Sequence, residues 1–135
     1  MLTRDQKYAT IIYDQICKIK REKQEKQEYK KYGVMAHKLP ILIYTAGLVQ
    51  ALEFVCSRGK PTQQCLLEDI AATIGYNNAN LLLNAVRDAE LSNYMYLTQQ
   101  ILAALLWYKR FAQSILGVEA SEAALDDGDS NDKSK

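Results

Sequence analysis

Few residues in this sequence have the types and the spacing that catalysis or metal binding requires. The single histidine is His37, and the three cysteines, Cys17, Cys56 and Cys65, show no CxxC spacing. A zinc site needs clustered Cys and His ligands, and a disulfide framework needs paired cysteines, so neither is predicted. No GxGxxG or Walker phosphate-binding motif is present. We therefore expect reduced thiols, no metal and no cofactor.

The carboxylates give no stronger case for chemistry. General acid–base catalysis commonly uses histidine or paired carboxylates whose pKa values are separated. Glu68 and Asp69 are adjacent, but neighbours in a helix do not face each other, so we expect both on a solvated face. His37 lies beside Lys38 and before Pro40, where we expect a helix end or an interface. The sequence thus predicts a protein that is not an enzyme.

Apolar residues at helical spacing predict which elements must position any functional surface. The chain has 135 residues, enough for one domain, and is 48% hydrophobic with only two prolines. Ile12, Ile16 and Ile19 repeat on one helical face, and no strand-like alternation is bounded by turns. We predict an all-α fold, a compact bundle of about five or six helices over residues 1–116. Residues 117–135 lack a pattern and are predicted to form a disordered acidic tail.

Capping and breaking residues indicate where the first helices begin and end. Thr3 with Gln6 has the capping-box spacing, so a helix should begin near residue 4. After a segment rich in Lys, Glu and Gln at 20–31, Gly33 predicts a break.

A second helix is expected over residues 34–56. Pro40 should kink it or mark a new start, and Gly47 should permit close helix–helix contact. A later short helix should end at Gly75, and the last helix at Gly117.

Charge is distributed unevenly along the chain. The net charge is +5 over residues 1–38, zero over 39–116 and −4 over 117–135. A basic front can indicate a polyanionic partner, although a solvated helix with a solubilising tail explains the same pattern. No export signal and no apolar run of membrane-spanning length is visible, so we expect a cytoplasmic protein without a membrane partner.

One segment has the pattern of a helix–turn–helix. Residues 70–76, followed by Leu81, place a small residue, a turn glycine and an apolar residue suitably. The would-be recognition helix carries only Arg87 as a cation, whereas specific DNA binding uses several. A DNA-binding regulator that reads DNA through Asn80, Asn84 and Arg87 remains an alternative, as does a helical adaptor that binds only proteins.

Four stretches, taken together, resemble one family. They are RDQKYA at 4–9, HKLPILI at 37–43 with GLVQALEF at 47–54, YMYLT at 94–98 and WYKRFA at 107–112. In this order and spacing they resemble the small subunit of the type III-B CRISPR effector, the Cmr complex, over about residues 3–116. The combination of the KLPILI and GLVQALEF block with the WYKRFA block carries most of the resemblance.

The resemblance implies a small all-helical subunit without catalytic activity. Several copies would stack head to tail along the guide RNA–target RNA duplex in antiviral RNA silencing. The implied partners are the backbone and large subunits of the complex, the RNA duplex and further copies of the chain. Target cleavage would belong to the neighbouring backbone subunit.

Such a subunit needs cations that meet phosphates without reading bases. Lys38, Lys109 and Arg110 lie in the resembling motifs and are the leading candidates, followed by Arg4. The further candidates are Lys18, Lys20, Arg21 and Lys23 on the first helix and Arg58 and Lys60 in a loop. A solvated or salt-bridged cation remains the alternative for each.

Overall fold

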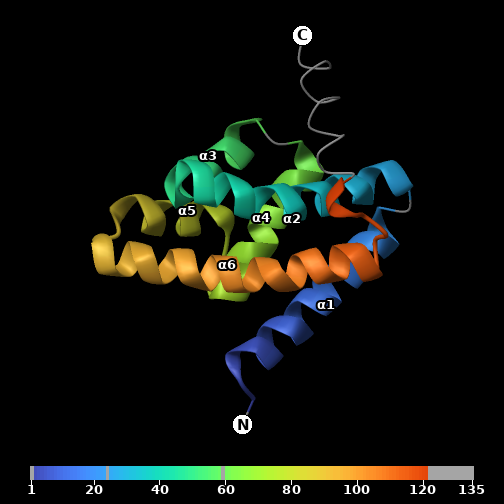
Figure 1. Cartoon of the computed structure of the whole chain (residues 1–135), viewed down its shortest axis with the longest axis horizontal. Coiled ribbons are helices and arrows are strands. Elements are labelled where there is room, and N and C mark those ends of the chain that lie inside the picture. The colour runs from blue at the N-terminus through green and yellow to red at the C-terminus, as the bar shows by residue number, and fades with distance from the viewer. Residues whose placement is uncertain (1, 24, 59, 122–135) are drawn as a thin grey trace.

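The structure is a computed structural model that describes residues 2–23, 25–58 and 60–121. Within these ranges it contains six α-helices and no strand, which confirms the predicted all-α bundle (Figure 1). The helices are α1 (Arg4–Glu22), α2 (Lys26–Ala46), α3 (Leu48–Arg58), α4 (Pro61–Ile74), α5 (Ala79–Asp88) and α6 (Leu91–Ser114). No helix in the described part of the chain has the length and apolar character that crossing a membrane requires.

Two predicted helix ends are confirmed in atomic detail. The Gln6 backbone N–H donates to Thr3 Oγ1 at 3.1 Å, and the Thr3 N–H donates to Gln6 Oε1 at 2.8 Å. This reciprocal pair satisfies two backbone donors at the start of α1. Gly75 ends α4 with a φ of +112°, and its N–H donates to the Ala71 carbonyl at 3.0 Å. A side chain with a Cβ rarely adopts this left-handed backbone, which is why glycine suits the position.

The sequence predicted a helix break at Gly33 and a close packing contact at Gly47, and the structure shows the reverse. The predicted break at Gly33 is wrong, because α2 runs through both Gly33 and Pro40, and no new helix starts there. A Cβ at Gly33 would lie 2.8 Å from Val118 Cγ2, so the missing side chain permits a close approach of the C-terminal segment. Gly47, with a φ of +91°, instead separates α2 from α3, and its N–H donates to the Ile43 carbonyl.

Helix α6 is the longest element, and it packs against α1, α2 and α4 (Figure 1). It runs antiparallel to α2: near its start, Tyr94 Oη accepts from the Val49 N–H, just past the end of α2. After its end, Val118 packs on Gly33 near the start of α2. The apolar core between the helices includes Ile12, Ile16, Leu39, Leu52, Leu66, Ile70, Leu82, Ile101 and Leu105.

The packed part of the chain extends beyond the expected domain end at residue 116. Val118 is 1% exposed, and its N–H donates to the Ala112 carbonyl at 2.9 Å. The Val118 carbonyl lies 2.8 Å from Nε2 of His37, which is buried within α2. The expected helix end at His37 is therefore wrong, because His37 lies inside α2, beneath the C-terminal segment. Residues 122–135 of the predicted tail lie outside the described residues.

Candidate nucleic-acid interface

A hydrogen-bonded network of polar side chains joins four helices in the interior. Tyr32 on α2 donates to Asp69 Oδ2 on α4 at 2.6 Å. Tyr108 on α6 donates to Gln15 Oε1 on α1 at 2.6 Å, and its hydroxyl lies 3.0 Å from Thr73 Oγ1 on α4. Because buried polar groups are costly unless paired, this network fixes how the four helices meet. We call these five residues the central network.

The expectation that Glu68 and Asp69 share a solvated face is wrong for Asp69. The two side chains diverge, as adjacent helical residues must. Glu68 is exposed and accepts the Ala79 N–H at 2.6 Å at the start of α5, whereas Asp69 turns into the central network. Burial raises the pKa of the Asp69 carboxyl to about 6, and the hydrogen bond from Tyr32 opposes part of that rise.

Burial inside the helix bundle explains the protonation states of the two tyrosines in the central network. Burial raises the pKa values of Tyr32 and Tyr108 well above the ordinary value for tyrosine, so both keep their protons and act as donors. No group of three or more His, Cys, Asp or Glu side chains in the described ranges is arranged to hold a metal ion.

Aromatic and cationic side chains gather on the surface where α1 meets α6. Tyr13 contacts Phe111 edge to face, with ring centroids 5.5 Å apart, and Phe111 stacks with Trp107 at 5.8 Å. The Arg110 guanidinium lies over the Trp107 ring, 5.7 Å from its centroid. Tyr13 is 49% exposed and Arg110 is also exposed, so this face is open to a ligand. We call Tyr13, Trp107, Arg110 and Phe111 the α1–α6 seam.

Two further predicted cations lie at the C-terminal end of the seam. Lys20 Nζ donates to the Ile115 carbonyl at 3.0 Å, which holds the ammonium against the end of α6. Lys20 and Arg21 line a hollow of about 610 Å³ together with Asp14, Cys17 and Ile115. The structure thus places Lys20, Arg21 and Arg110 along one pair of helices.

The remaining candidates are not gathered at the seam. Arg4 lies over the Tyr8 ring at 5.7 Å, at the start of α1. Lys18 pairs with Glu22 at 4.0 Å on an exposed face. Lys23 caps the end of α1, Lys38 is half-buried on α2, Lys60 precedes α4 and Lys109 is half-buried on α6. Arg58 ends α3, and its side chain lies outside the described residues.

The seam has the chemistry of a surface that binds a polyanion without reading its sequence. A guanidinium held over an aromatic ring keeps N–H groups at its edge for phosphate oxygens, and the ring limits its motion. The sequence analysis identified the cations but missed their aromatic partners. Trp107 with Arg110 and Phe111 at i+3 and i+4 was the available signal, because residues at these spacings meet on a helix.

The helix–turn–helix alternative is less well supported by the geometry. Helices α4 and α5 do flank a turn at Gly75. However, Arg87 donates through Nε to Glu53 Oε1 at 2.6 Å and through a terminal nitrogen to Asn84 Oδ1 at 2.8 Å. The cation of the expected recognition helix and one of its two asparagines are thus engaged within the protein.

Fold and surface together define a small all-helical protein whose most distinctive surface is cationic and aromatic. Residues 4–115 match the model of the family described as CRISPR-associated protein (Cas_Cmr5), and the chain belongs to this family.

The comparisons with individual proteins agree with this assignment. The chain is 43% identical over 116 residues to the CRISPR system Cmr subunit Cmr5 of Thermus thermophilus, covering 86% of this chain and 98% of the relative. It is also similar to the crystal structure of a CRISPR-associated Cmr5 family protein from the same species. That similarity has a TM-score of 0.76 and 43% identity, and it covers 85% of this chain and 98% of the other.

Proposed function

We propose that the protein is a non-catalytic small subunit of a type III-B CRISPR effector, the Cmr complex, in the cytoplasm. Its family membership and its 43% identity to a Cmr subunit support this role. Several copies stack head to tail along the guide RNA–target RNA duplex and bridge the backbone and large subunits. Target cleavage belongs to the neighbouring backbone subunit.

The α1–α6 seam is the observation that supports an RNA-facing role. An RNA duplex presents regularly spaced phosphates, and proteins that follow its shape contact them with Arg and Lys side chains. Arg110 is positioned over Trp107 for such a contact, with Lys109 next to it in the chain. A few contacts per copy suffice, because repetition along the RNA multiplies weak binding.

The decisive test reverses charge at Arg110 of the seam and at its chain neighbour Lys109 inside the assembled complex. The double variant Lys109→Glu/Arg110→Glu is expected to lower RNA occupancy, measured by crosslinking and sequencing of RNA bound to the purified complex. The matched control reverses an exposed cation outside the candidate set, Lys7→Glu, and should leave occupancy unchanged. Equal occupancy in both variants would favour the protein-only adaptor.

Experiments on the isolated chain separate this role from an enzyme and from a DNA-binding regulator. We expect weak, salt-sensitive RNA binding and no RNA cleavage. Cleavage that is abolished by substituting Asp69 would overturn the non-catalytic assignment. Sequence-selective binding of duplex DNA that depends on Asn80, Asn84 and Arg87 would instead support a DNA-binding regulator.

A further inference from the structure

Cations gather at the end of α1, where this helix meets the end of α6. Residues 18–23 hold one acid, Glu22, and four cations, which we call the basic end of α1: Lys18, Lys20, Arg21 and Lys23. The hollow of about 610 Å³ beside Lys20 and Arg21 contains one further acid, Asp14. Arg110 on the neighbouring seam adds a fifth cation. Positive charge therefore remains in excess on this surface after both acids are counted.

The described part of the chain ends close to this surface. Lys20 Nζ donates to the Ile115 carbonyl at 3.0 Å, and Val118, three residues later, packs on Gly33 near the start of α2. Figure 1 shows the orange-red end of the described chain beside the junction of α1 and α2. The residues after 121 therefore continue from a point next to the basic end of α1.

Residues 122–135 carry the opposite charge and are long enough to reach this surface. They hold two lysines and five acids, a net charge of −3; the acids are Glu122, Asp126, Asp127, Asp129 and Asp132. A segment of this length spans about 20 Å on average and up to about 45 Å when extended. Ile115 and Arg110 are only about 7.5 Å apart along the axis of α6, at 1.5 Å per residue. We call residues 122–135 the acidic segment.

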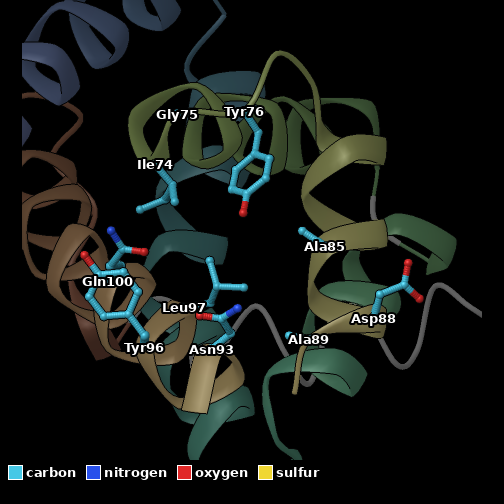
Figure 2. Close-up of a pocket in the computed structure, with 10 residues that line it drawn as sticks. All are labelled: Ile74, Gly75, Tyr76, Ala85, Asp88, Ala89, Asn93, Tyr96, Leu97 and Gln100. Carbon is cyan, nitrogen blue, oxygen red and sulfur yellow. The ribbon is translucent and has the colours of Figure 1, made fainter. Parts of the chain in front are cut away.

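A second hollow offers the acidic segment no opposite charge. This pocket, of about 510 Å³, lies between the end of α4, α5 and the first half of α6, and none of its described lining residues is basic. Figure 2 shows the Tyr76 ring and Leu97 directed into the pocket, and the Asp88 carboxylate directed away from it. Leu97 is also about 27 Å from Ile115 along the helix axis. Charge and distance thus both favour the basic end of α1.

We propose that the acidic segment binds the basic end of α1 and Arg110 in the free subunit and competes there with RNA. The proposal rests on the proposed RNA-facing role of the seam and adds an autoinhibitory contact to it. Carboxylates tethered to the same chain act at an effective concentration on the order of millimolar, so they occupy cations that a stray RNA with few phosphates needs. A long duplex offers many phosphates at once and displaces them.

Removal of the acidic segment tests the competition. A chain that ends at residue 121 keeps the contact of Val118 with Gly33. It should bind a short RNA duplex about threefold to tenfold more tightly than the full chain at low salt, and the gain should fade at high salt. A full-length variant in which the four aspartates of the segment are replaced by Asn should behave in the same way. Fluorescence anisotropy measures all three affinities, and equal values would overturn the proposal.

A second background separates a specific contact from general charge repulsion. In Arg21→Gln/Arg110→Gln the acidic segment loses two of its partners, so its removal should raise RNA affinity much less. The matched control, Lys7→Gln/Arg87→Gln, neutralises two exposed cations elsewhere and should keep the full gain. The same gain in both backgrounds would show that the segment acts through net charge alone, and would overturn the contact.

Crosslinking locates the acidic segment directly. Cys17 lines the hollow, whereas Cys56 at the end of α3 is more exposed and serves as an internal control. In Ser130→Cys, a short bis-maleimide should join position 130 to Cys17 within one chain, as mapped by mass spectrometry, and a long RNA duplex should suppress this product. Crosslinks to Cys56 alone, no crosslink, or a Cys17 product that RNA leaves unchanged would each overturn the proposal. Loss of RNA occupancy in the Lys109→Glu/Arg110→Glu complex would still support the proposed function, so the two failures are distinguishable.

Discussion

Tyr108 and Arg110 are two residues apart in the sequence, yet they belong to regions of opposite character. Tyr108 is fully buried and hydrogen-bonded within the central network, whereas Arg110 lies over Trp107 on the open α1–α6 seam. One turn of α6 thus serves both the interior and the surface. A motif such as WYKRFA can therefore combine residues required for folding with residues required for binding, and only burial and partners separate the two sets.

The largest expected loss of stability follows a substitution in the central network. Tyr108→Ala removes a buried ring and the hydrogen bonds that its hydroxyl makes with Gln15 and Thr73, so it should lower the free energy of unfolding by about 3–5 kcal/mol. Tyr13→Ala, on the exposed seam, is the control and should lower the free energy of unfolding much less than Tyr108→Ala. Urea denaturation measures both. Equal losses in the two variants would remove the distinction between interior and seam.

The second prediction concerns the pH dependence of stability that the buried Asp69 of the central network produces. The Asp69 carboxyl keeps its proton up to about pH 6 in the folded protein, whereas in the unfolded chain it ionises near its ordinary pKa of 3.8. Its stabilising contribution is complete below pH 3.8 and is lost as the pH rises through 6, up to about 3 kcal/mol in total. Asp69→Asn should abolish this loss, as measured by urea denaturation between about pH 3.5 and 7.5. A wild-type protein whose stability rises relative to the variant over that range would contradict the assignment.

The third prediction concerns binding at the seam. Arg110→Ala should weaken binding of a short RNA duplex up to about tenfold at low salt and lower the slope of log K against log salt by about 1. Stability should change little, because Arg110 is exposed. Fluorescence anisotropy at several salt concentrations gives both quantities, with Lys7→Ala as the control. An unchanged salt slope would show that Arg110 does not contact the RNA phosphates.

The smallest effect is expected outside both regions. Arg87 and Glu53 form an ion pair with side chains that are 48% and 37% exposed, and water and salt screen such pairs. Arg87→Ala should therefore change stability little and leave RNA binding intact. Thermal denaturation and the same anisotropy assay test this. A clear loss of nucleic-acid binding would revive the helix–turn–helix alternative.

Local signals in the sequence predicted most of the fold. The capping box at Thr3 and Gln6 and the left-handed turn at Gly75 depend on residues close in sequence, and both were located correctly. The two errors at Gly33 and Gly47 have a common cause. A glycine can either end a helix or admit a neighbouring segment, and at Gly33 that neighbour, Val118, is 85 residues away in the chain.

Long-range partners also explain which parts of the site could not be predicted. Gln15 and Tyr108 are 93 residues apart, so neither spacing nor composition indicates that they meet. Asp69 looked like a surface residue because its partner Tyr32 belongs to another helix. The cations could be identified individually, but their distribution over α1, α2, α3, α6 and the start of α4 depends on how these helices pack.

The contact of Val118 with Gly33 and His37 has a practical consequence for handling the protein. A chain truncated after residue 116 would lack Val118, which covers Gly33, and would lose the carbonyl that His37 contacts. Tags and fusion partners at the C-terminus should therefore follow residue 121 at the earliest, so that Val118 stays packed against Gly33 and His37 of α2.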